Sequence, residues 1–287
     1  MKNTKKIITL LLVICSILTQ FNIYPVSAAL PTTDASYTAP VVMRSLNFNN
    51  AATTAISITN DFSGINEYIN PLGFNMSAHI RTPQTDPKID IVNDPQKGNV
   101  LKFQDSTGDL SNNENGFYLN FTNPVNSQQS VDILSTNKNI TYEFEVKTSR
   151  NDVFLPFVRS GPAIGPNMNI NSGGNSAKLQ VRDDSSDRNV MPFSANAWYN
   201  LKVVMDNSLG GKGKYRAFNG DTILQNPNDS TYVYTFRNSI SSLTYMDYYL
   251  NTASIPIPEA YFNNIVVRDF PKLVSQKLLN SANQEIQ

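Results

Sequence analysis

The segment from Ala197 to Leu224 constrains the fold most, because its alternation and its turn residues describe one local structure. Apolar residues alternate from Leu201 to Met205, which is the period of a strand with one buried face. The next alternating run ends at Asn219-Gly220, the strongest short-range signal for a hairpin turn with positive φ at both central residues. A third strand, Thr222 to Leu224, completes a predicted antiparallel meander. No helical period competes with it, so the sequence predicts an all-β protein.

Further short alternating segments lie along the chain, separated by stretches rich in Gly, Asn, Asp and Pro. They are Phe48 to Ile58, Asn99 to Gln104, Gly116 to Phe121, Asn139 to Thr148, Val153 to Arg159 and Ala177 to Arg182. Strands with this spacing favour an antiparallel β-sandwich of two sheets.

The two ends of the chain after residue 28 differ from its centre. Ala29 to Met43 contains Pro, Thr and Ser with little periodicity, and we expect an extended lead-in. The tail, Pro271 to Gln287, has apolar residues spaced as in a short amphipathic helix. The predicted sandwich therefore spans Arg44 to Phe270.

Met1 to Ala28 has the layout of a secretory signal peptide. Three lysines precede the apolar run Ile7 to Leu18, and Val26-Ser27-Ala28 is a small-residue cleavage site. The apolar run is shorter than the roughly 20 residues that span a bilayer. We therefore expect a secreted, extracellular protein with no membrane span. Cleavage removes the only cysteine, Cys15, so packing alone must hold the mature domain together, as is typical of Gram-positive bacterial secreted proteins.

Charge excludes one class of partner. Cleavage removes three lysines, so the 23 basic residues fall to 20 against 23 acidic ones, a net charge near −3. About 259 of the 287 residues remain, enough to bury one sizeable core. Such a chain, without basic clusters, has no field that attracts nucleic acid or an anionic membrane. We expect no nucleic-acid partner.

Two motifs resemble one superfamily. Trp198-Tyr199, an alternating strand ending at Asp206, a Gly-rich loop and Tyr215 to Gly220 are similar to the meander of concanavalin A-like jelly rolls, which include lectins, glucanases and laminin G-like modules. Ala260 to Asp269 resembles their closing strand, with Asn263 where an Asp is common. The resemblance implies a concanavalin A-like jelly-roll β-sandwich that contacts carbohydrate.

Glu143 and Glu145 share the polar face of the strand Ile140 to Val146 and are candidate catalytic residues. The glucanases of this superfamily carry Glu-x-Asp-x-Glu, and the resemblance assigns the first, nucleophilic position to Thr141. A threonine cannot form the glycosyl intermediate of a retaining mechanism. A glycoside hydrolase is therefore an alternative rather than the favoured function.

A polysaccharide lyase is the second enzymatic alternative. His79 is the only histidine, and Arg81 would share its strand face as the group that neutralises a uronate. The Arg-Ser-Glu and Tyr-Phe-Lys-x-Gly signatures of the superfamily's lyases are absent from the sequence. A surface or core-edge histidine is the ordinary interpretation.

Sugar binding needs an aromatic ring for the apolar face of a sugar and planar polar groups for its hydroxyls. We expect Trp198 in the core and the binding groups on the outward side of the central strands. The predicted ligand-binding residues, with the two tyrosines as platforms, are Tyr118, Glu143, Glu145, Arg159, Gln180, Arg182 and Tyr215. The favoured function is non-catalytic binding of an extracellular polysaccharide, and a protein-binding adhesin is a further alternative.

Many jelly rolls hold their loop ends with a calcium ion. The resemblance makes Asp61, Asn263 and Asn264 the candidate ligands of a structural calcium ion. Asn263 replaces the usual Asp and so removes one charge.

Overall fold

The computed structural model describes residues 33–37, 42–57, 62–80, 87–105, 115–134, 139–150, 157–160, 163–171, 177–206, 212–228, 232–250, 259–269 and 273–278. The chain divides into two compact units, one of Val42–Phe270 and one of Met1–Val41 with Pro271–Gln287. The predicted signal peptide, Met1 to Ala28, lies outside the described residues. Among the helices of the described ranges, none is both long and apolar enough to cross a membrane.

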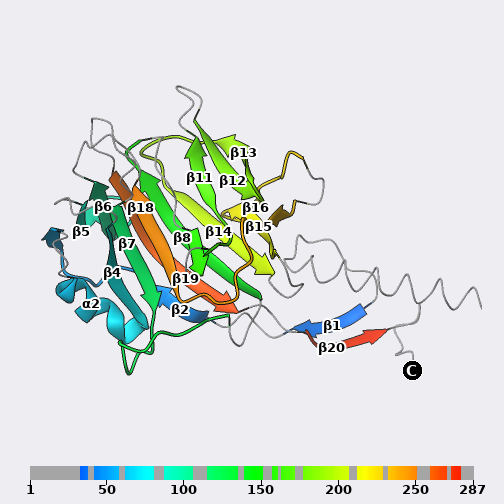
Figure 1. The fold of residues 1–287 in the computed structure, drawn as a ribbon, viewed down its shortest axis with the longest axis horizontal. Coiled ribbons are helices and arrows are strands. Elements are labelled where there is room, and N and C mark those ends of the chain that lie inside the picture. The colour runs from blue at the N-terminus through cyan, green and yellow to red at the C-terminus, as the bar shows by residue number, and fades with distance from the viewer. Residues whose placement is uncertain are drawn as a thin grey trace, which may run out of the picture. The chain divides into compact units, whose positions relative to one another are not determined.

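The larger unit contains a ten-stranded antiparallel sheet (Figure 1). Its main path runs β16-β15-β14-β8-β19-β6-β5-β3, with β17 on β15 and β2 on β19. The strands are β2 (Val42–Leu46), β3 (Thr54–Ser57), β5 (Pro87–Asp94), β6 (Gly98–Asp105), β8 (Asn139–Thr148), β14 (Tyr199–Asp206), β15 (Lys214–Asn219), β16 (Thr222–Ile223), β17 (Tyr234–Thr235) and β19 (Glu259–Asp269).

Two smaller antiparallel sheets form the second layer. The five-stranded sheet has the order β10-β9-β18-β7-β4 and the three-stranded sheet the order β11-β12-β13. Their strands are β4 (Phe74–Ile80), β7 (Asn115–Phe121), β9 (Phe157–Ser160), β10 (Ala163–Ile164), β11 (Met168–Asn171), β12 (Lys178–Asp183), β13 (Ser186–Pro192) and β18 (Tyr245–Leu250). The helical elements of the described residues are α2 (Ser63–Ile69) and η1 (Asn70–Leu72).

Both small sheets pack on the same face of the ten-stranded sheet. The ring of Tyr248 in β18 meets that of Phe262 in β19 edge-on, with centroids 5.0 Å apart. At the other end, the one hydroxyl proton of Tyr215 in β15 is shared between the carbonyls of Asn167, beside β11, and Arg182, in β12. The prediction of an all-β antiparallel sandwich is confirmed, except that the second layer consists of two sheets rather than one.

The predicted meander is confirmed as β14, β15 and β16, but its second turn lies one residue later than predicted. Asn219 stays in β15, where it pairs with Leu201 and Thr222. The two central residues are therefore Gly220 and Asp221, and only Gly220 has a positive φ, of 57°. A glycine with positive φ at the first central position alone is the pattern of a type II′ turn, not of the predicted type I′ turn.

The short helix predicted in the C-terminal tail is wrong for Leu273–Leu278. These residues form strand β20, which pairs antiparallel with β1 (Thr33–Tyr37), with Asp34 opposite Lys277. A short apolar pattern fits a strand as well as a helix, so periodicity alone does not decide between them. The strand partner satisfies the backbone groups of both segments.

A hydroxyl pair between the two layers offers a test of the core. The Oη atoms of Tyr142 in β8 and Tyr248 in β18 lie 3.1 Å apart in the core, and burial raises the pKa of both phenols. Replacing either tyrosine by Phe leaves the other hydroxyl buried without that partner, so the free energy of unfolding should fall by about 1–3 kcal/mol. Chemical denaturation of the singles and of Tyr142→Phe/Tyr248→Phe completes a cycle. We expect the double variant to regain much of the loss, whereas additive losses would contradict the coupling.

Two glycines with open surroundings test the turn. A Cβ atom at Gly220 or at Gly64 in α2 would meet nothing within 4 Å, but only Gly220 has a positive φ. Gly220→Ala should lower the free energy of unfolding by about 1–2 kcal/mol, since only the backbone strain changes. The matched Gly64→Ala should be neutral or raise it by up to about 1 kcal/mol. Equal thermal stability of the two variants would rule out the positive φ at Gly220.

Candidate functional site

The predicted binding residues separate onto three parts of the sandwich. Tyr118 lies on β7 and Arg159 on β9 of the five-stranded sheet, while Gln180 and Arg182 lie on β12 of the three-stranded sheet. Tyr215 is only 1% exposed and packs in the core, so its predicted role as a surface platform is wrong. Glu143 and Glu145 lie on the outward face of the ten-stranded sheet, which points away from the second layer. Their neighbours on β8 are buried against that layer, so the two glutamates point the other way.

Two partly exposed tyrosines lie on the outward face of the five-stranded sheet. Phe117 and Leu119 face the core, which turns Tyr118 outward. Tyr245 on β18 is its diagonal neighbour, and the two rings meet edge-on with centroids 4.8 Å apart. We call Tyr118 and Tyr245 the tyrosine pair. Two aromatic rings held side by side on a sheet are the kind of surface that contacts the apolar face of a sugar.

Polar groups surround the tyrosine pair. Asn120, opposite Tyr245, donates hydrogen bonds through Nδ2 to the Asn75 carbonyl (3.0 Å) and to Ser77 Oγ (2.9 Å). Ser77 and Asp247 are the register partners of Tyr118 on its two sides. Asp247 is 0% exposed, so the polar groups that this sheet presents beside the two rings are the partly exposed amide of Asn120 and hydroxyl of Ser77.

The candidate lyase residues are placed only in part. His79 occupies the position of β4 that pairs with Gly116, one strand away from the tyrosine pair. Arg81 lies outside the described residues. Their joint action as proton acceptor and charge neutraliser therefore stays a prediction.

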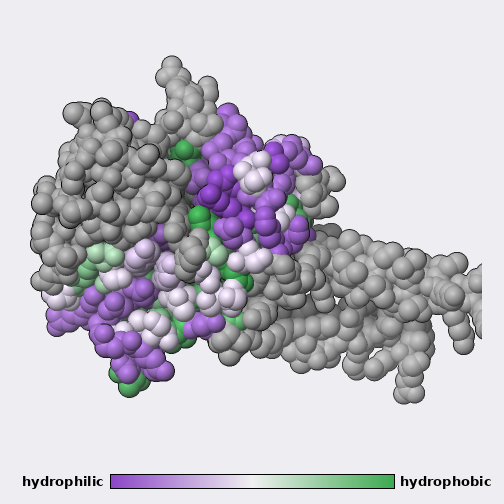
Figure 2. All heavy atoms as spheres, in the orientation of Figure 1, coloured by the Kyte–Doolittle hydropathy of each residue, from purple (hydrophilic) through white to green (hydrophobic). Residues whose placement is uncertain are grey.

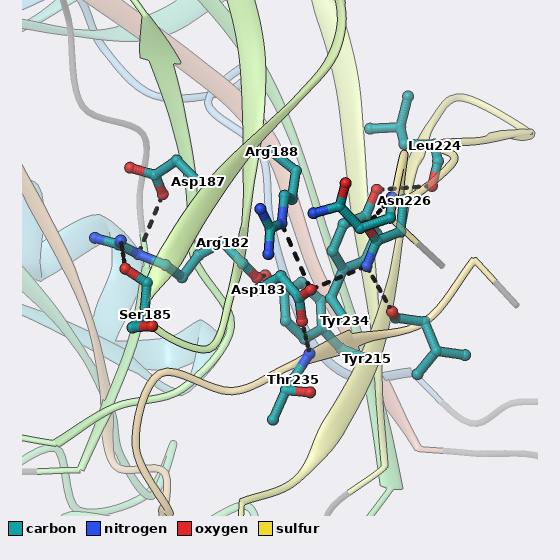
Figure 3. Close-up of polar contacts among 12 residues, drawn as sticks. Arg182, Asp183, Ser185, Asp187, Arg188, Tyr215, Leu224, Asn226, Tyr234 and Thr235 are labelled. Atoms are coloured by element: carbon teal, nitrogen blue, oxygen red, sulfur yellow. Dashed lines mark hydrogen bonds and ion pairs between the residues drawn. The ribbon is translucent and has the colours of Figure 1, made fainter. Parts of the chain in front are cut away.

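The hairpin of β12 and β13 carries Gln180 and Arg182 and is anchored by Asp183 (Figure 3). The Asp183 carboxylate accepts hydrogen bonds from the Thr235 backbone N–H (3.0 Å) and from Asn226 Nδ2 (3.2 Å). Figure 3 shows Arg182 turned the other way, where Nε lies 3.1 Å from Asp187 Oδ1. These hydrogen bonds connect the hairpin to Thr235 of β17 and to Asn226, and so fix the position of the outward residues of the hairpin.

Each candidate catalytic carboxylate is the acceptor of an ion pair. Glu143 Oε1 lies 2.6 Å from Arg268 Nη2, across the β8–β19 pair. Glu145 Oε1 lies 2.7 Å from Lys97 Nζ, and its Oε2 accepts a hydrogen bond from Asn264 Nδ2 (2.8 Å). Both ion pairs lie on the face of the sandwich opposite the tyrosine pair.

The candidate calcium ligands take different positions. Asn263 is 1% exposed, and its Oδ1 accepts a hydrogen bond from the Phe48 backbone N–H (3.4 Å). Asn264 is exposed, with a φ of 45°, at a β-bulge opposite β8. Asp61 lies outside the described residues. Within the described ranges no three His, Cys, Asp or Glu side chains gather into a metal site, and the structural calcium ion stays a prediction.

Trp198 was predicted to lie in the core, and this prediction is wrong. It is partly exposed, and its Nε1 donates a hydrogen bond to Asp94 (3.3 Å). Lys147 Nζ lies 5.2 Å from the centroid of its ring, within cation–π range, and also pairs with Asp94. Sequence reasoning missed Asp94, although Asp94-Pro95 before Gly98 is a turn signal that places an acceptor beside Gln96 and Lys97.

Comparison with known proteins gives only distant likenesses. No family model and no curated protein matches the chain. An alginate lyase, Aly36B, solved with an alginate trisaccharide, is 13% identical over 84% of this chain and 100% of the lyase, with a TM-score of 0.48. A sialidase is 10% identical over 77% of this chain and 19% of the sialidase, with a TM-score of 0.47. The binding domain of botulinum neurotoxin serotype D is 12% identical over 84% of this chain and 50% of that one, with a TM-score of 0.45.

The chain therefore spans about a fifth of the sialidase and about half of the neurotoxin chain. Identities and scores this low assign no activity, substrate or partner to the chain.

The Asp94 cluster predicts how stability depends on pH. Burial alone would raise the pKa of Asp94, but hydrogen bonds from Lys147, the Gln96 backbone and Trp198, together with the Lys147 charge, lower the pKa below its ordinary value. A lowered pKa in the folded state stabilises the protein fully above the unfolded pKa of about 3.9. This stabilisation is lost as the pH falls through the folded-state pKa.

We expect Asp94→Asn to lower the free energy of unfolding at neutral pH, because the variant loses the Lys147 ion pair. The gap to the wild type should narrow below about pH 4, where the wild-type carboxylate starts to be protonated in the unfolded chain. Urea titrations at a series of pH values measure this difference in the free energy of unfolding between Asp94→Asn and the wild type. Asp221→Asn, at an exposed position, is the control. A gap that widens towards acid pH would contradict the assignment.

Proposed function

We propose that this protein is secreted and binds an extracellular polysaccharide without cleaving it. The tyrosine pair on the five-stranded sheet is the observation that carries the proposal. Its rings lie on the face turned away from the core, and the partly exposed amide of Asn120 and hydroxyl of Ser77 occupy adjacent strand positions. The rings would contact the apolar faces of sugar units, and the polar groups would bind the hydroxyls.

Two features support binding without catalysis. A retaining glycosidase needs two carboxylates acting on one sugar bond. Here Glu143 and Glu145 are tied to Arg268 and Lys97 on the face opposite the tyrosine pair. Thr141, in the position of the missing nucleophile, is 3% exposed. A lyase remains the alternative, through His79 on the strand beside β7.

Retention by immobilised polysaccharides tests the proposal. The mature protein is passed over alginate, polygalacturonate, laminarin and xylan, and the ultraviolet absorbance of unsaturated products and the reducing ends are recorded. We expect retention by at least one polymer, with no products. Tyr118→Ala and Tyr245→Ala should each weaken that binding about tenfold or more, which corresponds to about 1.4 kcal/mol.

Tyr261→Ala is the matched control, because Tyr261 is a partly exposed tyrosine on the ten-stranded sheet. It should bind as the wild type does, and all three variants are checked for folding by thermal melting. Product formation that His79→Ala abolishes would establish the lyase instead. No retention by any polymer would leave a protein-binding adhesin as the better function.

A further inference from the structure

Three amide side chains form a row across the three-stranded sheet. Asn169 on β11 is the register partner of Gln180 on β12, which in turn pairs with Asn189 on β13. Gln180 Nε2 donates a hydrogen bond to Asn189 Oδ1 (2.9 Å). We call Asn169, Gln180 and Asn189 the amide row. Figure 2 shows mainly hydrophilic residues where Figure 1 places β12 and β13.

A β-bulge creates the amide row. Leu179 pairs with Met191 while Gln180 pairs with Asn189, so Val190 is an extra residue on β13. Without this insertion, Gln180 would face Val190 instead of an amide. Bulges re-aim side chains and are frequent beside functional sites. The bulge therefore brings a third amide to the same face as the other two.

Asn169 and its neighbour Asn167 have buried acceptors without a partner. Their side chains are 7% and 5% exposed, and neither Oδ1 accepts a hydrogen bond. Met168 and Ile170 pack in the core, so alternation turns Asn167 and Asn169 to the other face of the sheet. A buried acceptor without a donor is unfavourable, and a donor supplied by a ligand would remove that cost. The terminal torsion of asparagine is soft, so the amide can turn towards a ligand on the sheet face.

The charges beside the amide row nearly cancel. Arg182 lies beside Asp187, which leaves Lys178 as the charged residue on the other side of Gln180 along β12. Each amide offers both an acceptor and donors, as does each hydroxyl of a sugar. We propose that the amide row, with Asn167, is a second glycan-contact area, which binds the hydroxyls of a neutral polysaccharide. This inference rests on the proposed function in taking a polysaccharide as the ligand.

Two matched Asn→Leu substitutions separate binding from folding. Asn169→Leu removes an acceptor that has no partner, so the melting temperature should stay the same or rise. Asn226 is also buried, at 1% exposed, but its Nδ2 donates hydrogen bonds to Asp183 and to the Val233 carbonyl, so Asn226→Leu should lower the melting temperature. A purely structural Asn169 would instead lose stability on substitution, which would overturn the inference.

Titration calorimetry with the neutral polymers laminarin and xylan, and with alginate, completes the test. We expect Asn169→Leu and Asn189→Leu to weaken binding of a neutral polymer about tenfold. Lys178→Gln should leave it unchanged. Binding to alginate alone, lost in Lys178→Gln, would overturn the assignment to a neutral glycan.

The two proposals can fail separately. If Tyr118→Ala loses binding while Asn169→Leu and Asn189→Leu bind like the wild type, the amide row is not a contact area and the proposed function stands. If the wild type binds none of the polymers, both fail.

Discussion

The structure depends on one buried layer of side chains between the ten-stranded sheet and the two smaller sheets. Phe103 of β6 meets Phe117 of β7 edge-on at 5.4 Å, and Tyr248 stacks on Phe117 at 4.6 Å while its hydroxyl meets that of Tyr142. Each fully buried phenylalanine contributes roughly 1.5–3 kcal/mol, against about 0–1 kcal/mol for a surface ion pair. The aromatic core, rather than the many ion pairs, therefore holds the layers together.

The two outward faces then differ in chemistry. On the ten-stranded sheet the ion-pair acceptors Glu143, Glu145, Asp94 and Glu259 each have a cationic partner. Hydrogen bonds from Lys102 and Tyr261 lower the pKa of Glu259 in spite of its burial. These four carboxylates are therefore already paired with other residues of the protein. The opposite face carries the tyrosine pair and the amide row. The aromatic surface of the first and the unpaired Asn169 oxygen of the second suit an external ligand better.

Alternation predicted which residues of each strand face the core, but not which sheet each strand joins. The pattern of β8 correctly turned Tyr142, Phe144 and Val146 inward and Glu143 outward. It could not show that the glutamates and Tyr118 lie on opposite sides of the sandwich, because this depends on long-range strand order. Tyr215 shows the same limit: its register partner is the buried Met205, and only that pairing reveals that the tyrosine is buried too. Trp198 was misjudged because aromatic residues are usually core, whereas its N–H and ring contact Asp94 and Lys147.

The β-bulges explain why the candidate sites were harder to predict than the fold. Side chains in a strand alternate with a period of two, so a single extra residue reverses the face of everything after it. The bulge at Val190 brings Asn189 beside Gln180, and the one after Asn263 gives Asn264 a positive φ and a contact with Glu145. Neither segment contains a glycine that would indicate a bulge. The residues that such irregularities bring together are invisible to a periodic analysis, and here they include the amides with which the protein would contact a glycan.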